Sequence, residues 1–468
     1  MSDRSTSIRL GDFESSVERI DMGIPQGSPI SPILYLFYNA DLLDECYDIS
    51  ISTDPIGFVD DINILTYSKS LERNCKNLEK VYQKCQNWAT SHGSKFNPKK
   101  FELIHFTRKR EALGKAITLE GVTIPPSKDI KILGVFLNSG LTATAHLETL
   151  QKRVPALLGA LKSITKSTWG LSLQTGRDLY LKAIRPALSY GATAWFPLEK
   201  EAKALRGKLN AIQGRFLRSI TGAYRATSTE ALEIETFTEP LDLFIERTAN
   251  LGLIRQVQRG LGNEIKLFSQ RIIERTRRGA RKQNLSFERA LTTLEGRLRV
   301  NKDLSKKEKG QEDPLKRYKR ALEAFYAIKW RKRWLKSQKG RAIARYRPYP
   351  TKEALELYKD RAKAHCSILI QLRTEKIGLK AFLKGRRVPG YEDSTCECQE
   401  EEETVQHFLL RCQRWRTQRE EILGTRAKTN GVYSRNKNHK PKGDRIPPLY
   451  KEIRAIPGNS LHHYTIVL

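Results

Sequence analysis

The pattern of apolar residues changes once along the chain, near Ala143, and this change constrains the fold more than any other feature. Before it, short β-rich runs alternate with a helical stripe. After it, apolar residues recur at spacings of three and four over long stretches, which is typical of amphipathic helices. We therefore predict an α+β region with an antiparallel sheet and helices over residues 1–140, followed by a helical region over 141–270.

The α+β region contains a candidate hairpin that carries two adjacent acids. In PIGFVDDINILTY, residues 55–67, two short β-rich runs flank Asp60 and Asp61, which predicts a hairpin with the acids at its tip. Carboxylates this close together need a cation to neutralise them, and their hard oxygens suit Mg²⁺. The alternative is that the Asp-Asp pair is simply a turn signal.

Three further elements are predicted around this hairpin. Apolar spacings of three and four predict a helix over 71–88, with Gly93 as its left-handed stop. The segments FELIHF (101–106) and IKILGVFL (130–137) are predicted to be strands.

The helical region shows two apolar stripes, each of which predicts a buried helix face. They are Leu147, Leu150, Val154, Leu157, Leu161 and Ile164 for the first, and Leu209, Ile212, Phe216 and Ile220 for the second.

The charge of the chain predicts a polyanionic partner. Lysine and arginine number 84 against 52 for aspartate and glutamate, a formal net charge of +32. No run approaches the roughly 20 apolar residues that span a bilayer, and the N-terminus lacks the apolar core of a secretory signal, so we expect an intracellular protein without membrane insertion. Residues 425–468 have few apolar side chains and are predicted to be a disordered tail.

Residues 271–350 form a basic, aromatic region, which we interpret as part linker and part helix, with a solvated stretch at 306–314. Residues 315–347 hold thirteen basic residues and one acid, Glu323. Cations interleaved with aromatic rings can grip single-stranded nucleic acid. The alternative is an amphipathic helix with its aromatic residues in the core. The candidate nucleic-acid-binding residues are Trp330, Arg331, Lys332, Arg333 and Trp334.

Three cysteines and one histidine cluster within the predicted C-terminal segment 351–424. Cys396, Cys398, His407 and Cys412 supply three thiols and one imidazole, a complete set for a closed, structural Zn²⁺ site. The alternative is a coincidental group of reduced cysteines.

Four blocks of sequence, taken together, resemble a known family. GIPQGSPISPIL begins at Gly23, FVDD at Phe58, FNPKKFE at Phe96 and ILGV at Ile132. In order and spacing these blocks resemble the palm of non-LTR (LINE-like) retrotransposon reverse transcriptases, the fungal type most closely. The helical segments after the palm resemble the thumb and connector of this family, and ETVQHFLLRC, ending at Cys412, resembles its C-terminal zinc-knuckle-like segment, which is expected to bind RNA or target DNA.

The resemblance implies roles for individual residues. Asp60 would be a metal ligand supported by Asp61, and Lys99 or Lys100 would lie near the leaving pyrophosphate, unless both are solvated loop lysines. The residues implied to contact template and nucleotide are Pro25, Gln26, Gly27, Ser28 and Phe58, and those implied for the primer-gripping hairpin are Leu133, Gly134 and Val135, for which an ordinary buried strand is the alternative.

One departure from the family affects the expected activity. Two-metal nucleotidyl transfer needs further carboxylate support, which the family draws from an aspartate upstream of the PQG block. Only 22 residues precede Gly23, and Asp3, Asp12 and Asp21 lack an apolar strand context. We expect the fingers to be missing as well. We therefore expect an N-terminally truncated reverse transcriptase that cannot polymerise alone.

The partners and cofactors expected from the resemblance are an RNA template, a DNA primer or target, dNTPs, Mg²⁺ for the palm and Zn²⁺ for the C-terminal segment, with the nucleus as the place of action. The competing hypothesis is a non-catalytic remnant that binds nucleic acid through its basic stretch and zinc segment. A group II intron maturase shares the palm blocks, but the Cys/His segment argues against it. The oligomeric state stays open.

Overall fold

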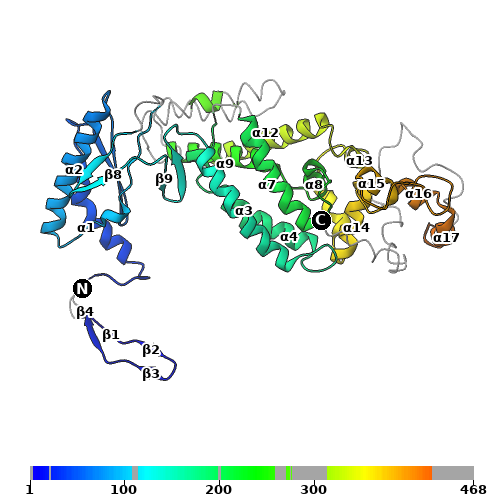
Figure 1. Ribbon diagram of the computed structural model, residues 1–468, viewed down its shortest axis with the longest axis horizontal. Helices are drawn as coiled ribbons and strands as arrows, with labels where there is room; N and C mark the ends of the chain where they lie inside the picture. The colour runs from blue at the N-terminus through cyan, green and yellow to red at the C-terminus, as the bar shows by residue number, and fades with distance from the viewer. Residues whose placement is uncertain are drawn as a thin grey trace. The chain divides into compact units, whose positions relative to one another are not determined.

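The computed structural model describes residues 4–20, 23–107, 114–198, 202–258, 270–274, 276 and 314–423. The chain divides into two compact units, Met1–Thr142 and Ala143–Leu468, so the boundary falls where the apolar pattern changes (Figure 1). Of the linker predicted at 306–314, all but Pro314 lies outside the described residues, as does the tail predicted at 425–468.

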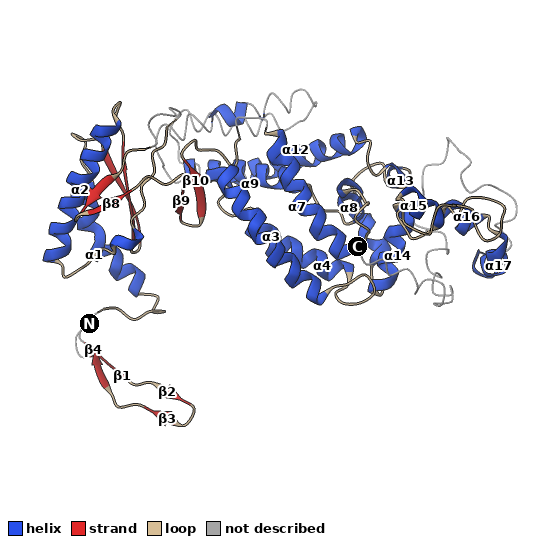
Figure 2. Ribbon diagram, viewed as in Figure 1, coloured by secondary structure: helices blue, strands red, loops and turns tan. Residues whose placement is uncertain are grey.

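The first unit combines helices with small antiparallel sheets, which agrees with the predicted α+β class (Figure 2). Its described strands form five separate two-stranded sheets, so the sheet predicted for the palm is divided among hairpins. The elements are β1 (Arg4–Thr6), β2 (Arg9–Leu10), β3 (Phe13–Glu14), β4 (Glu18–Ile20), α1 (Ser31–Cys46), β5 (Thr53–Phe58), β6 (Asp61–Thr66), α2 (Leu71–Ser91), the 3₁₀ turn η1 (Pro98–Lys100), β7 (Ile117–Leu119), β8 (Val122–Ile124), β9 (Asp129–Ile132) and β10 (Val135–Asn138).

Helix α2 organises the core of this unit. The predicted helix and its stop are confirmed, since α2 is followed by Gly93 at φ +63°. Its apolar side chains serve two clusters rather than one: Val81 and Cys85 pack against Leu42 of α1, while Cys75 packs near Ile117 of β7.

The prediction of a strand at residues 101–106 is wrong. This segment has alternating burial but makes only a single bridge, from Leu103 to Pro126, and Pro126 has no N–H with which to extend a ladder. The sequence reasoning also missed the hairpin of β7 and β8. The signal was β-branched residues on both sides of Glu120 and Gly121, which adopt φ values of +49° and +77°, the left-handed pair that a two-residue hairpin turn requires.

The second unit is helical in its described residues. Its elements are α3 (Thr144–Ile164), α4 (Leu173–Leu179), the π-helical turn η3 (Tyr180–Ile184), α5 (Arg185–Leu188), α6 (Ala192–Trp195), α7 (Lys203–Thr221), α8 (Thr229–Glu235), α9 (Leu241–Gln258), α12 (Pro314–Lys336), α13 (Arg341–Ala344), the 3₁₀ helix η4 (Lys352–Tyr358), α14 (Lys363–Arg373), α15 (Lys380–Gly385), α16 (Val405–Leu410), the 3₁₀ turn η5 (Gln413–Trp415) and α17 (Arg416–Leu423).

The two predicted apolar stripes lie on α3 and α7. All four residues predicted for α7 are buried, which confirms that face. On α3 the prediction fails toward the C-terminal end, where Leu158 is buried in place of Leu157 and Ile164 is 44% exposed.

A buried ion pair joins the middle of this unit to its C-terminal part. The Arg373 guanidinium lies 2.7 Å from Oε1 of Glu235, which is fully buried, and the Tyr358 hydroxyl donates to the other oxygen of the same carboxylate. Among the described residues, no helix combines the length and apolar character needed to cross a bilayer.

Candidate active site and metal centre

The acidic pair lies at the tip of the β5–β6 hairpin, as predicted. Phe58 and Asp61 are the last paired residues of the two strands, so Val59 and Asp60 form a two-residue turn. Val59 adopts φ +55°, a conformation that a β-branched residue rarely takes and that stores local strain. Both carboxylates are exposed, so they are accessible to a cation and a substrate.

Helix α1 holds this turn in place. The buried Asn39 donates a hydrogen bond from Nδ2 to the Val59 carbonyl oxygen at 3.2 Å, which fixes the strained residue. One turn earlier, burial raises the pKa of Tyr35, and the negative charge of Asp60 raises it further. Gly57 lets α1 approach β5 closely, since a Cβ there would lie 3.0 Å from both methyl carbons of Leu43.

Asn39 and Tyr35 were missed by the sequence reasoning, which treated SPILYLFYNADLL as an apolar helix start. The available signal was their spacing, because residues four apart lie on one helix face. A buried amide on an apolar face needs a partner, and the Val59 carbonyl is that partner.

The loop that precedes α1 is a tight turn. Ser28 donates from its backbone N–H to Pro25 O at 3.4 Å, and Gly27 supplies φ +90° at the third turn position. The Ser31 hydroxyl donates to the same carbonyl oxygen at 2.7 Å, which ties the loop to the helix. Gln26 is exposed at the tip, so its amide is free to meet a ligand.

The remaining predicted palm residues lie on two other elements. Lys99 and Lys100 are exposed in η1, which Asn97 caps, and among the described residues no ion pair joins them to Asp60 or Asp61. The segment predicted as one strand at 130–137 is instead the hairpin of β9 and β10.

The β9–β10 hairpin turns at Leu133 and Gly134, with φ values of +46° and +83°. A hairpin therefore lies at the residues for which the family resemblance implies one. The side chain of Leu133 is 43% exposed at the turn, and Val135 is buried behind it.

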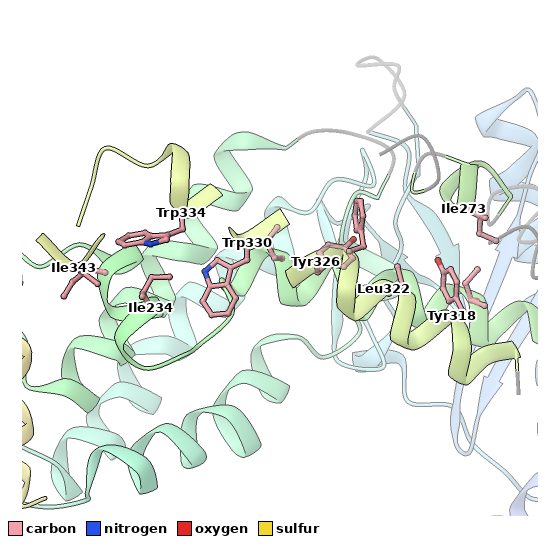
Figure 3. Packing of buried hydrophobic residues seen from close by; sticks show 12 residues of the cluster. Ile234, Ile273, Tyr318, Leu322, Tyr326, Trp330, Trp334 and Ile343 are labelled. Carbon is pink, nitrogen blue, oxygen red and sulfur yellow. The ribbon is translucent and has the colours of Figure 1, made fainter. Parts of the chain in front are cut away.

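Five of the six aromatic residues at 315–347 lie in the core, and the sixth, Tyr346, is 37% exposed. Trp330 and Trp334 are 6% and 2% exposed, and α12 points them toward Ile234 and Ile343 (Figure 3). Trp334 also donates its indole N–H to the Arg347 carbonyl oxygen at 2.9 Å. Of the two interpretations of this stretch, the structure shows the helix with buried aromatics, so neither tryptophan is available to stack on a base.

Some cations of α12 are neutralised by acids of α9. Lys329 lies 2.8 Å from Glu246, and Arg333 lies 2.8 Å from the almost fully buried Asp242. Arg331 instead covers the ring of Tyr349, and Lys332 is exposed. The predicted basic face therefore consists of cations that are paired with acids inside the fold and cations that face the solvent.

The Cys/His cluster has the geometry of a four-ligand metal centre. The ligand atoms of Cys396, Cys398, His407 and Cys412 all lie within 4.8 Å of one another. In a tetrahedral site with Zn–S bonds of about 2.3 Å, neighbouring sulfurs lie about 3.8 Å apart. The Sγ atoms of Cys396 and Cys412 are 3.7 Å apart, and Cys398 Sγ lies 3.2 Å from His407 Nε2, so the donor set fits zinc.

Local turns bring these four ligands together. Gln399 adopts φ +63° and donates to the Cys396 carbonyl oxygen, which lets the tight Cys-x-Cys spacing fold back on itself. Thr404 caps α16 by accepting from the His407 N–H, and His407 Nδ1 lies 3.4 Å from Glu401 Oε2. A carboxylate beside the second ring nitrogen is the usual way in which a metal-binding histidine is oriented.

Comparison with known proteins gives the class of this region. Residues 9–137 match the family model described as "Reverse transcriptase (RNA-dependent DNA polymerase)", so they constitute a reverse transcriptase domain. The match covers the acidic hairpin, the Pro25–Ser28 loop and most of the β9–β10 hairpin.

The relatives of the chain are proteins of non-LTR retrotransposons, which confirms the resemblance. The "RNA-directed DNA polymerase from mobile element jockey" of Drosophila melanogaster is 26% identical over 48% of this chain and 24% of its own length. The "Retrovirus-related Pol polyprotein from type-1 retrotransposable element R1 2" of Nasonia vitripennis is 25% identical over 88% of this chain and 90% of its own length.

The chain thus spans about a quarter of the jockey-type relatives that it matches and most of the shorter Nasonia protein. No solved structure matches the chain. These relatives come from insects, and the fungal type stays a prediction.

Proposed function

We propose that this chain contributes the metal-binding hairpin and the nucleic-acid contacts of RNA-directed DNA synthesis by a retrotransposon reverse transcriptase. The substrates would be an RNA template, a DNA primer or target strand, and dNTPs. The observation that carries this proposal is the exposed Asp60–Asp61 pair, held on the β5–β6 turn by the hydrogen bond from Asn39 inside the matched region.

Each palm residue would have a role that follows from its chemistry. Asp60 and Asp61 offer hard carboxylate oxygens that suit Mg²⁺. When bound, Mg²⁺ supplies positive charge for the attacking and leaving oxygens. Gln26 can donate to and accept from a base or sugar, and Gly27 lets a strand approach the backbone.

Two further elements would then take part. Lys99 or Lys100 would offset the charge of the departing pyrophosphate. The exposed turn at Leu133 and Gly134 would support the primer strand from the β9–β10 hairpin.

We infer that the acidic pair does not support synthesis by itself. Among the described residues, the groups of three or more candidate metal ligands do not include Asp60 or Asp61. Two-metal transfer requires ligands for ions about 3.5–4 Å apart. The 468-residue chain should therefore incorporate nucleotides only when another segment or chain supplies a further carboxylate.

Two measurements on the full chain test these statements. Mn²⁺ binding, followed by electron paramagnetic resonance with an RNA template, a DNA primer and dTTP present, should weaken in Asp60→Asn. It should not weaken in Asp44→Asn, a matched charge change at an exposed position of α1. Equal binding in both variants would refute the role of the hairpin.

Primer extension under the same conditions tests the second inference. We expect incorporation no higher than in Asp60→Asn. Incorporation that depends on Asp60 would show that the chain polymerises alone and would overturn the need for a further acid.

A second candidate function is nucleic-acid binding without catalysis, favoured by the solvent-facing cations of α12 and by the Cys/His centre. Lys319, Lys332 and Lys336 are exposed on α12. RNA affinity should fall steeply between 50 and 200 mM salt, as expected when phosphates are neutralised by lysine and arginine. A flat salt dependence would exclude this function. A nuclear location would follow from either function if the target is chromosomal DNA.

A further inference from the structure

A cavity of about 580 Å³ lies in the second unit, between α7, the segment after it, α8 and the turn between α12 and α13. Its described lining includes no residue of the acidic hairpin or of the Cys/His centre. Its lining includes Arg218, Arg225, Arg333, Lys339 and Lys376, with Glu230 and Glu233 as the acids and Thr227, Ser228, Thr229 and Thr374 as the hydroxyls.

The shape of this cavity depends on a glycine. Gly340 adopts φ +69°, and a Cβ there would lie 2.9 Å from Ala231 Cβ and 3.0 Å from Ser228 Oγ. The turn after α12 can therefore press against the start of α8 and bring Lys339 to the cavity. No other residue type would allow this approach without displacing the wall.

The charge balance of the cavity is positive. Arg218 donates to the Thr227 carbonyl oxygen at 2.8 Å, and Arg333 is paired with Asp242, so these two are held in place. Arg225, Lys339 and Lys376 have no carboxylate partner among the described residues. The only acids of the described lining are Glu230 and Glu233, and burial raises the pKa of Glu233 well above its usual value, which weakens its opposition to the cations.

The hydroxyl groups add an unsatisfied donor. Thr227 is 1% exposed, lines the cavity, and its Oγ1 has no hydrogen-bond partner. Buried polar groups are normally paired. A buried hydroxyl without a partner, in a lining that also holds three cations without a carboxylate partner, indicates a ligand that accepts hydrogen bonds and carries negative charge.

We propose that this cavity binds the sugar–phosphate backbone of a nucleic-acid strand. Arginine, lysine and threonine are side chains that contact phosphate oxygens, and no aromatic ring belongs to the described lining, so the cavity offers no platform for a base. Recognition is therefore independent of sequence. The nature of the strand rests on the proposed function, because retrotransposon synthesis brings RNA and DNA to the protein.

The test measures binding of a fluorescein-labelled 20-nucleotide oligo(U) to the full chain by anisotropy, over a range of salt. Arg225→Gln with Lys339→Gln should lower affinity about tenfold at 0.1 M salt and reduce the salt slope by about 1.4, two contacts at 0.7 each. The matched control is Lys203→Gln with Arg215→Gln, two exposed positions of α7 outside the cavity. It should change affinity less than about twofold.

A substitution that removes a negative charge, and is expected to raise affinity, distinguishes the proposal from misfolding. Glu230→Gln removes one of the two acids of the lining and should raise oligo(U) affinity about two- to threefold, by the same phosphate electrostatics. Equal losses in the cavity and control double variants, or no gain in Glu230→Gln, would overturn the proposal.

The same cavity variants distinguish a strand from a free nucleotide. If they weaken dTTP binding as much as oligo(U) binding, the site takes a free triphosphate and the proposal is overturned. The assay does not involve Asp60, so a failed palm function with intact cavity dependence, or the reverse, would be seen separately.

Discussion

Replacement of Trp334 tests whether the aromatic residues of the basic stretch stabilise the fold or bind nucleic acid. Trp334 is 2% exposed, and its indole N–H donates to the Arg347 carbonyl oxygen at 2.9 Å. Trp334→Phe keeps an aromatic ring but leaves that carbonyl unpaired, at a cost of about 1–3 kcal/mol. Trp334→Ala also empties the site and should cost about 3–5 kcal/mol.

The assay is urea unfolding of the full chain followed by far-UV circular dichroism, with oligo(U) affinity measured on the folded protein. The midpoint of the helical unit should fall in Trp334→Phe and further in Trp334→Ala, while the affinity of Trp334→Phe should stay within about twofold. The neighbouring Leu335, 50% exposed, is the control, and Leu335→Ala should change stability by less than about 0.5 kcal/mol.

The opposite pattern would refute the reasoning. If Trp334→Phe left the unfolding midpoint unchanged and reduced RNA affinity, the ring would have to stack on bases, and the packing of α12 would be incorrect.

Three further predictions concern the metal centre and two buried carboxyls. Purified protein should hold one Zn²⁺ per chain by elemental analysis; Cys398→Ser should lower this content and Cys46→Ser should not, and equal contents would refute the centre. Burial raises the pKa of Glu233, so the native protein loses stability as pH rises from about 4.5 through the raised pKa. The urea midpoint of Glu233→Gln should therefore exceed that of the unaltered protein at pH 8 but match it at pH 4, and a gap that does not widen with pH would contradict this. Arg373→Met leaves the Glu235 carboxylate buried without its cation, which should cost about 3–5 kcal/mol in the same unfolding assay; a loss under about 1 kcal/mol would show that the pair is solvated.

The features that local chemistry determines were predictable from the sequence. The Asp60–Asp61 turn, the α2 helix and its Gly93 stop follow from residue order alone, because turn residues and apolar spacing act over a few positions. The Cys/His cluster was equally predictable from the sequence, since its four ligands lie within 17 residues and a short turn at Gln399 brings them together.

Features that depend on contacts distant in sequence were not predictable. The hydrogen bond from Asn39 to Val59 joins residues 20 apart, and the spacing of Tyr35 and Asn39 places them on one helix face without showing what that face contacts. The partners of the α12 side chains lie on α8, α9 and α13, so the pattern of its cations and aromatics could not show which face is buried. The segment 101–106 had strand composition, but its neighbour Pro126 removes the donor that a ladder needs.

The buried side of α12 has a consequence for how the unit moves. The helix has 23 residues and is about 35 Å long, and its buried side chains share one cluster with residues of α8, α9 and α13. Such continuous packing makes local opening of any one of these helices costly, so their amides should exchange with solvent as a single cooperative unit. The exposed lysines of α12 therefore belong to a helix that its packing holds rigid. Their spacing is set before a strand arrives, and little backbone entropy is lost when phosphates bind to them.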